Sequence, residues 1–183
     1  TAHHAGMIRD HHIGSGARIR IIRSGEVIPK LEEVLRPSLD LRIPGLCPSC
    51  SGPLIWQKDF LRCTNHSECP AQVVQGLRHW FRILETADWF GLKSLERIVA
   101  GGFRSLESIY AMTETDFLSL DFGPVQSRNF VAALQTSRRT SIDDARFLAA
   151  FGITDLGLGD SRNLLRHFPI ETLSELTVER LEA

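Results

Sequence analysis

Residues 47–50 read Cys-Pro-Ser-Cys, and the two remaining cysteines of the sequence follow at positions 63 and 69. The spacing is Cys-x2-Cys-x12-Cys-x5-Cys, and a two-residue gap allows one tight turn to place two thiolates on the same ion. Zn²⁺ takes four such ligands in a tetrahedron, and a shell of four thiolates leaves no position for a reacting water. The spacing therefore predicts a small zinc finger whose structural ion is bound by Cys47, Cys50, Cys63 and Cys69.

Other interpretations of these cysteines remain open. An even number of cysteines is also compatible with two disulfides in a small secreted domain. Their clustering within 23 residues and the Cys-Pro-x-Cys turn favour a metal instead. Unrelated thiols are a second alternative, and replacement of one thiolate by His66 is a third. A zinc hydrolase is disfavoured because it needs an open metal position.

Ahead of the cysteines, residues 18–28 are rich in β-branched side chains that partly alternate with arginines. This pattern predicts a strand, a turn at Ser24-Gly25, and a second strand that ends at Pro29. Two strands cannot close a sheet by themselves. We therefore interpret residues 1–40 as part of a small β-barrel.

Behind the cysteines, apolar residues recur in steps of three and four, which is typical of amphipathic helices. Further short helices follow, separated by glycine-containing turns, and the first apolar face consists of Val73, Val74, Leu77, Trp80, Phe81 and Leu84. We expect a zinc finger at 41–72 and a mainly helical domain at 73–183. The predicted fold class is α+β, with a partial barrel, a zinc finger and a helical domain in this order.

The charge of the chain is nearly balanced, with 21 Lys and Arg against 22 Asp and Glu over 183 residues. Near-neutrality counts against a nucleic-acid partner, because such domains are usually basic. However, residues 1–36 and 47–82 each carry a net charge of +2, whereas residues 83–183 carry ten basic and fifteen acidic groups. Charge alone therefore excludes no partner, but the absence of a long apolar run excludes a membrane span.

Three turns between the predicted helices share an apolar–Gly–apolar pattern, centred on Gly91, Gly123 and Gly157. Two short helices joined in this way form a helix-hairpin-helix. The missing side chain lets a phosphate approach, and amides at the next helix N-terminus point toward it. These donors are neutral, so an acidic domain can still bind a DNA backbone. The alternative is that the glycines are C-caps in an ordinary helical bundle.

Several signatures follow one another in the order found in one protein family. Residues 22–29, Ile-Arg-Ser-Gly-Glu-Val-Ile-Pro, are similar to a signature in the second half of that family's OB-fold barrel. The cysteine segment, including Arg62-Cys63-Thr64-Asn65, is similar to its zinc finger. His79-Trp80-Phe81 and the three glycine turns are similar to its helix-hairpin-helix domain. Over nearly all residues, the chain resembles the C-terminal half of bacterial NAD-dependent DNA ligases.

This resemblance implies a partial OB-fold, a zinc finger, and a helix-hairpin-helix domain that ends before the family's last hairpin. It also implies that the chain holds nicked double-stranded DNA by its sugar–phosphate backbone, without sequence specificity. The implied DNA contacts are Arg18, Arg20 and Arg23 on the barrel and the amides around Gly91, Gly123 and Gly157.

The resemblance places the catalytic chemistry elsewhere. Ligases of this family transfer AMP from NAD to a lysine in a Lys-x-Asp-Gly motif, which none of Lys30, Lys58 and Lys93 occupies. We therefore expect no catalytic residue here, and no activity of this portion alone. NAD and adenylyl transfer belong to an upstream adenylation domain, which is the implied partner in the same chain. The implied location is the bacterial cytoplasm, at the nucleoid.

Four residues depart from the family's pattern. His4 stands where the family usually has Asn, and Trp89, Asp121 and Asp155 stand where the hairpins usually have their first glycine. Bulky or acidic side chains there are expected to weaken the approach of a phosphate. These departures and the acidic rear half keep an alternative open, namely a non-catalytic zinc-containing module that derives from a ligase and binds DNA or a protein.

Overall fold

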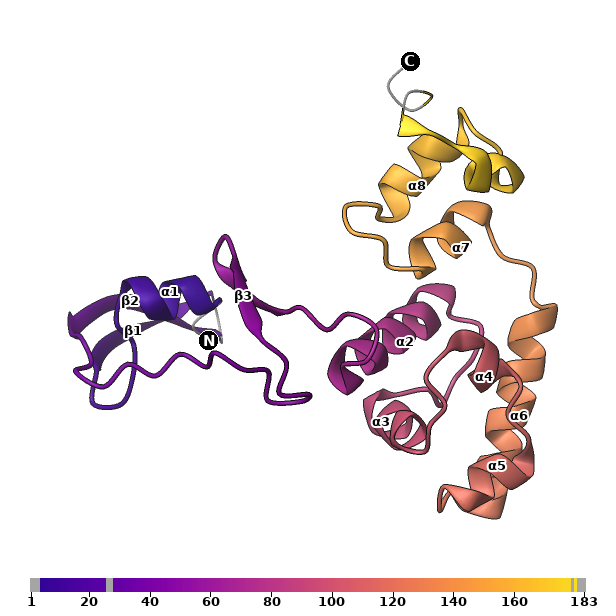
Figure 1. Ribbon diagram of the computed structural model, residues 1–183, viewed down its shortest axis with the longest axis horizontal. Helices are drawn as coiled ribbons and strands as arrows, with labels where there is room; N and C mark the ends of the chain where they lie inside the picture. Colours follow the sequence, from indigo (N-terminus) through magenta and orange to yellow (C-terminus); the bar gives the residue numbers. More distant parts are fainter. Residues whose placement is uncertain (1–3, 26–27, 179, 181–183) are drawn as a thin grey trace. The chain divides into compact units, whose positions relative to one another are not determined.

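The computed structural model of the chain describes residues 4–25, 28–178 and 180. It contains two compact units, Thr1–Cys69 and Pro70–Ala183 (Figure 1). The first unit holds one short helix and two small sheets, and the second is helical. Glu26 and Val27, which belong to the signature at residues 22–29, lie outside the described residues.

The first sheet is the antiparallel pair of β1 (Arg18–Ser24) and β2 (Ile28–Arg36). Pro29 lies inside β2, opposite Arg23, so the prediction that the second strand ends at Pro29 is wrong. Each strand of a two-stranded sheet is an edge strand, and an edge tolerates the missing N–H of a proline. Most of β2 therefore lies beyond the predicted end of the strand.

A short helix that the sequence pattern did not predict, α1 (Ala5–Asp10), precedes this sheet. Its N-cap is His4, whose Nδ1 accepts a hydrogen bond from the backbone N–H of Met7 at 3.1 Å. An asparagine side chain caps in the same way, so the departure at His4 keeps the local structure. The Gly6 N–H donates to the Asp59 carbonyl at 2.8 Å, which holds α1 against the second hairpin.

That second hairpin consists of β3 (Leu54–Gln57) and β4 (Phe60–Cys63), joined by Lys58 and Asp59. In the described part of the chain the two sheets are separate, and no barrel closes. The fold thus has the predicted mixture of helix and small antiparallel sheets, with the cysteines at and around the second hairpin.

The second unit confirms the helical rear half. The predicted face of its first helix lies in the core, with Val74, Leu77, Trp80, Phe81 and Leu84 all buried. Its elements are α2 (Pro70–Leu84), α3 (Leu92–Ala100), α4 (Leu106–Tyr110), α5 (Glu114–Ser119), α6 (Pro124–Arg139), α7 (Asp144–Ala150), α8 (Leu158–Leu165) and the 3₁₀ helix η1 (Ile170–Glu175).

These helices pack as consecutive pairs, α2 with α3, α5 with α6, and α7 with α8, and α7 also packs against α2. Contacts between aromatic rings join the pair α5–α6 internally and also connect it to the turn that precedes α3. The Phe130 ring stacks on Phe117 at 4.7 Å and meets Phe90 and Phe122 edge-on at 5.1 and 4.9 Å between centroids. Phe90 and Phe122 belong to the glycine turns, so each of these turns is anchored in the core. Among the described residues, no helix is long and apolar enough to cross a bilayer.

Candidate functional site

The four cysteines meet at one point, although they come from four places in the sequence. Their sulfur atoms all lie within 4.8 Å of one another. The Sγ atoms of Cys47 and Cys69 are 3.9 Å apart, and those of Cys50 and Cys63 are 3.5 Å apart. Four sulfurs bound to one tetrahedral Zn²⁺ at about 2.3 Å are separated by about 3.8 Å. The cluster therefore has the dimensions of a four-thiolate metal site.

The chain around Cys47 is folded into a tight knuckle. The Ser51 N–H donates to the Cys47 carbonyl at 2.8 Å, and the Cys47 N–H donates to the Gly52 carbonyl at 2.8 Å. A Cβ on Gly52 would lie 3.3 Å from the Cys50 sulfur and 3.8 Å from the Cys63 sulfur. Gly52 thus lets the backbone pass close to the sulfurs.

The electrostatics of the cluster favour a bound cation. The pKa of Cys47 is lowered, chiefly by the backbone amides of Ser49 and Cys50. The Gly52 amide also acts to lower the pKa of Cys50, but lost hydration and the three neighbouring sulfurs outweigh it and raise this pKa to about 11. Crowded thiols resist ionisation because their negative charges repel one another, whereas a dication among them favours the thiolate form.

No disulfide links any of the four cysteines, and both short sulfur–sulfur distances far exceed the roughly 2.05 Å of a disulfide bond. The disulfide alternative therefore does not describe this structure. Because four sulfurs complete a tetrahedral shell, the cluster can bind an ion and hold the hairpin β3–β4 to the Cys47 knuckle. It offers no open position for catalysis.

Each of the three glycine turns ends at the N-terminus of a helix. Gly91 is the N-cap of α3, Gly123 that of α6 and Gly157 that of α8, with φ values of −73°, −67° and −77°. The alternative that these glycines are C-caps is therefore wrong. No side chain caps the three helices, so first-turn amides that lack intrahelical partners point outward.

The three turns also share a backbone conformation before the glycine. Trp89, Asp121 and Asp155 each stand two positions earlier and have positive φ values of 78°, 60° and 61°. Glycine adopts this left-handed conformation most easily, Asp tolerates it, and a bulky residue such as Trp rarely does. The departures noted in the sequence thus coincide with three equivalent backbone positions.

The three glycines have no packing reason to lack a side chain. A Cβ on Gly91 or Gly123 would meet no atom within 4 Å, and one on Gly157 would meet only the Asp160 carboxylate at 3.7 Å. Their φ values are accessible to any residue. Nothing in the described fold requires glycine at these three N-caps.

Arg18, Arg20 and Arg23 of β1 are all exposed. Two register shifts interrupt the pairing of β1 with β2, one between Arg18 and Ile19 and one between Arg20 and Ile21. The Nη1 atom of Arg20 is 2.9 Å from an Oε2 of Glu33 and 3.9 Å from that of Glu32. Arg20 is therefore partly neutralised within the sheet.

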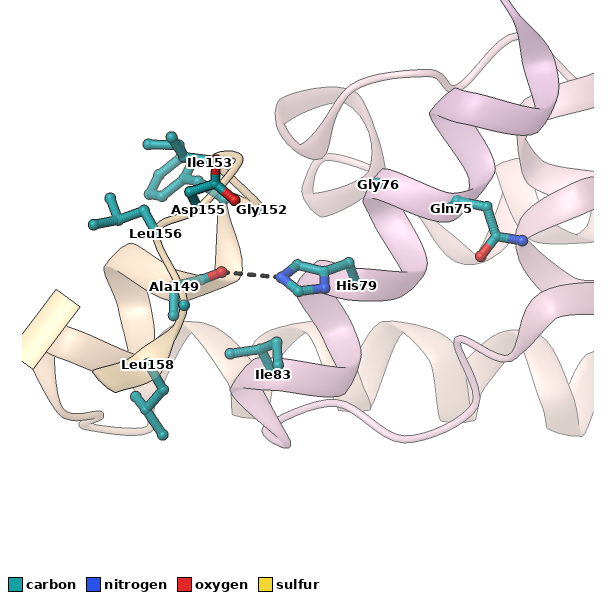
Figure 2. Close-up of a pocket in the computed structure, with 12 residues that line it drawn as sticks. Gln75, Gly76, His79, Ile83, Ala149, Gly152, Ile153, Asp155, Leu156 and Leu158 are labelled. Atoms are coloured by element: carbon teal, nitrogen blue, oxygen red, sulfur yellow. Dashed lines mark hydrogen bonds between the residues drawn. The ribbon is translucent and has the colours of Figure 1, made fainter. Parts of the chain in front are cut away.

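One polar surface was missed by the sequence interpretation, which treated α2 only as a core helix. Gln75, Arg78, His79 and Arg82 border a single hollow on its outer face. The His79 ring points from α2 toward α7, where its Nε2 lies 3.0 Å from the Ala149 carbonyl oxygen (Figure 2). The available signal was the composition of Pro70–Leu84, which contains arginines but no acidic residue.

Comparison with known proteins gives a consistent relationship. The DNA ligase of Desulfatibacillum aliphaticivorans is 60% identical over 183 residues, which cover all of this chain and 29% of that ligase. The DNA ligase of Desulfotalea psychrophila is 48% identical over the whole chain and 27% of its own length. That of Shewanella baltica is 41% identical over 98% of the chain and 28% of its own length.

No family model matches the chain. The chain spans less than a third of the length of these curated relatives. The resemblance to DNA ligases that the sequence signatures indicated is thereby confirmed, and the chain is homologous along its whole length to a portion of DNA ligases.

Proposed function

We propose that the chain is the C-terminal DNA-binding portion of an NAD-dependent DNA ligase and holds nicked duplex DNA by its sugar–phosphate backbone. One observation carries this proposal. Gly91, Gly123 and Gly157 are exposed N-caps that have ordinary φ values and open space where a side chain could stand. Serine caps a helix better than glycine does. Glycine at all three positions is therefore better explained by a ligand that approaches the backbone closely.

A phosphate is the ligand that this arrangement suits. The uncapped amides of a helix N-terminus and the helix dipole together favour an anion. Three equivalent helix ends in one domain match a polymer that repeats its phosphates. Contacts of this type position a protein on DNA without reading the sequence, which agrees with the absence of sequence specificity that we propose.

The exposed apolar side chains of the β1–β2 sheet suggest that this sheet is part of a larger barrel. Several apolar side chains of the β1–β2 sheet are exposed, including Ile21 at 57% and Ile28 at 70%. A lone two-stranded sheet is marginal in water, and further strands would cover these side chains. We propose that β1 and β2 belong to an OB-fold whose other strands lie elsewhere in the ligase. In that setting Arg18 and Arg23 are candidates for phosphate contacts.

We propose Zn²⁺ as the ion of the four-cysteine cluster, with Cys47, Cys50, Cys63 and Cys69 as its ligands. Soft thiolates in a tetrahedral arrangement select zinc over the hard ions Mg²⁺ and Ca²⁺. When bound, the ion supplies no reaction chemistry, because its shell is complete. Its role is to fix the knuckle and the hairpin β3–β4 in one arrangement.

We assign the reaction itself to other parts of the ligase. No lysine of this chain stands in a Lys-x-Asp-Gly motif, so NAD and adenylyl transfer are assigned to an upstream adenylation domain. The chain alone is expected to bind DNA but not to seal nicks. The cytoplasm, where the chromosome lies, is the compartment in which such a ligase works.

The experiment replaces Gly91, Gly123 and Gly157 together by serine. The triple variant is expected to keep or slightly raise its melting temperature, because serine caps helices. Its affinity for a labelled nicked duplex, measured by fluorescence anisotropy at low salt, is expected to fall at least tenfold. Gly45→Ser is the matched control, because a Cβ at Gly45 also meets open space. Unchanged affinity of the triple variant would refute binding through the helix ends.

A second candidate function is favoured by one feature of the first hairpin. Trp89 is 54% exposed and occupies the left-handed position next to the helix end, where its ring competes with a phosphate. A derived module that binds a protein through such a surface is the alternative. Trp89→Gly separates the two functions, because it should increase affinity for DNA but decrease affinity for a protein that contacts the ring.

A further inference from the structure

The outer face of α2 carries a basic stripe, formed by Gln75, Gly76, Arg78, His79 and Arg82. We propose that this stripe is a second contact for the phosphates of a DNA strand, beside the third hairpin. This inference rests on the proposed function, since it assumes DNA as the ligand. It adds a charged contact site to the neutral helix ends.

The charge of the stripe is not compensated within the protein. α2 contains no acidic residue, and none of the ion pairs in the described part of the chain includes Arg78 or Arg82. The two arginines are four positions apart, and like charges at this spacing destabilise a helix. An acidic domain thus keeps one helix face positive.

Gly76 is a second feature of this face that the fold does not explain. It is exposed in the middle of α2, and a Cβ there would meet no atom within 4 Å. A glycine inside a helix is less favourable than almost any other residue. Its exposed backbone leaves room for another molecule to approach between Gln75 and His79. In this respect Gly76 resembles the glycines of the hairpins, which also have open space where a Cβ would stand.

Arg82 is held in place by a chain of two hydrogen bonds. A carbonyl oxygen only accepts, so His79 Nε2 must carry the proton that it donates to Ala149 at 3.0 Å. The other ring nitrogen, Nδ1, then accepts from Arg82 Nη2 at 3.3 Å. This contact uses one of the five N–H donors of the guanidinium and leaves the others for a ligand. His79 is thus a positioning residue for Arg82.

The stripe is continuous with the third hairpin. A hollow of about 500 Å³ lies between α2 and the turn from α7 to α8 (Figure 2). Gly157 at the start of α8 is among the residues that line it. A neighbouring hollow of about 340 Å³ is bordered by the stripe, and the two share Gln75 and His79. Phosphates on one strand can therefore meet the arginines and the amides of α8 in succession. Asp155 is the only acidic residue that borders the two hollows in the described part of the chain, and it stands on the hairpin side.

A DNA strand suits these two neighbouring hollows better than an acidic protein segment does. The larger hollow is lined mainly by apolar side chains, among them Ile153 and Leu156, which suit a deoxyribose ring. Arg78 and Arg82 border the neighbouring hollow, and Gly157 at the start of α8 borders the larger one. The two kinds of donor thus suit a ligand with phosphates at regular intervals. An acidic peptide as ligand is kept as one outcome of the test.

The test compares the chain with its double variant Arg78→Gln/Arg82→Gln, in titrations of a labelled nicked duplex at several salt concentrations. Each lost phosphate contact is expected to reduce the steepness of log affinity against log salt by about 0.9. Two lost contacts reduce it by about 1.8, so between about 50 and 200 mM salt the parent chain should lose about twelvefold more affinity than the variant. The matched control is Arg42→Gln/Lys93→Gln, which removes two arginine or lysine charges that are paired with Asp40 and Glu96.

The outcomes separate this inference from the proposed function. If the stripe variant keeps the parent's salt dependence, or the control changes it equally, the stripe is not a DNA contact. If the glycine triple variant binds normally while the stripe variant does not, the hairpins fail and the stripe stands. If the chain binds a poly-glutamate peptide more tightly than the duplex, and Arg78→Gln/Arg82→Gln removes this binding, the ligand is a protein and the inference is overturned. His79→Ala should weaken DNA binding and reduce the salt slope by no more than about 0.9, because only the contact of Arg82 depends on this placement.

Discussion

Gly152→Ala tests how the third hairpin is joined to α2. Gly152 has a φ of +67°, and a Cβ there would lie 3.2 Å from the Cδ2 atom of His79. The left-handed conformation costs an alanine about 1–2 kcal/mol. The reduced freedom of the unfolded chain offsets about 0.4–1 kcal/mol of that cost. The contact adds a further loss, because the imidazole must shift and its hydrogen bond to Ala149 lengthens.

A hydrogen bond of this kind contributes about 0.5–1.5 kcal/mol. We therefore expect Gly152→Ala to lower the free energy of unfolding by about 2 kcal/mol, as the sum of the net conformational cost and the weakened hydrogen bond. Gly102→Ala is the control, since Gly102 has a φ of +98° and open space around it. This control pays only the conformational cost, about 1 kcal/mol.

The assay is urea unfolding, followed by circular dichroism at 222 nm, which reports the helical unit. In a His79→Ala background, Gly152→Ala should cost about 1 kcal/mol less than in the parent chain, because the ring that it displaces is absent. The reasoning is refuted if Gly152→Ala and Gly102→Ala differ by the same amount with and without the imidazole, or if Gly152→Ala leaves stability unchanged.

Three further outcomes are expected. The purified chain should contain about one zinc per molecule. Cys63→Ser should lower this zinc content and loosen the hairpin β3–β4, which faster amide hydrogen exchange in residues 54–63 would show. Full retention of zinc by the variant would contradict the assigned ligand set. Trp89→Gly should stabilise the chain by up to about 1 kcal/mol in urea unfolding, because glycine relieves the left-handed strain at φ 78°; a loss of stability would show that the indole ring contributes more than the strain costs. The pKa of Asp116 is lowered by the hydroxyl and the amide of Thr113. The contribution of Asp116 to stability is therefore present above the unfolded pKa of about 3.9 and is lost as the pH falls through the lower folded pKa. Asp116→Asn should remove this acid-dependent part from a pH series of melting curves, and an identical pH dependence would contradict the assigned cap.

The sequence predicts those parts of the structure that local chemistry controls. The spacing of the cysteines is sufficient to predict the ligand cluster, because a four-thiolate site needs little else. The periodicity of α2 predicts its buried face, because a long amphipathic helix has a repeated signal. The glycine turns are also predicted, although their role as N-caps rather than C-caps is decided only by the backbone angles.

Features that depend on neighbours were not predictable. α1 has six residues and is capped by a histidine, so neither its length nor its cap gives a strong signal. Pro29 indicates a strand end in general, but the edge position of β2 removes that restriction. The composition of α2 indicates its basic face, but the placement of Arg82 on that face depends on a contact between His79 and Ala149, which are 70 positions apart. No local pattern contains that information.

The open glycine N-caps have a consequence for laboratory evolution. Each one is a position where a single serine should raise the heat resistance of the chain by improving a helix end, at no packing cost. A selection for thermostability alone should therefore enrich serine at Gly91, Gly123 and Gly157, and a selection for DNA retention should remove it again. Serine at these three positions would thus be enriched in one selection and depleted in the other. Positions with such opposite responses can locate a backbone-binding surface without any bound ligand.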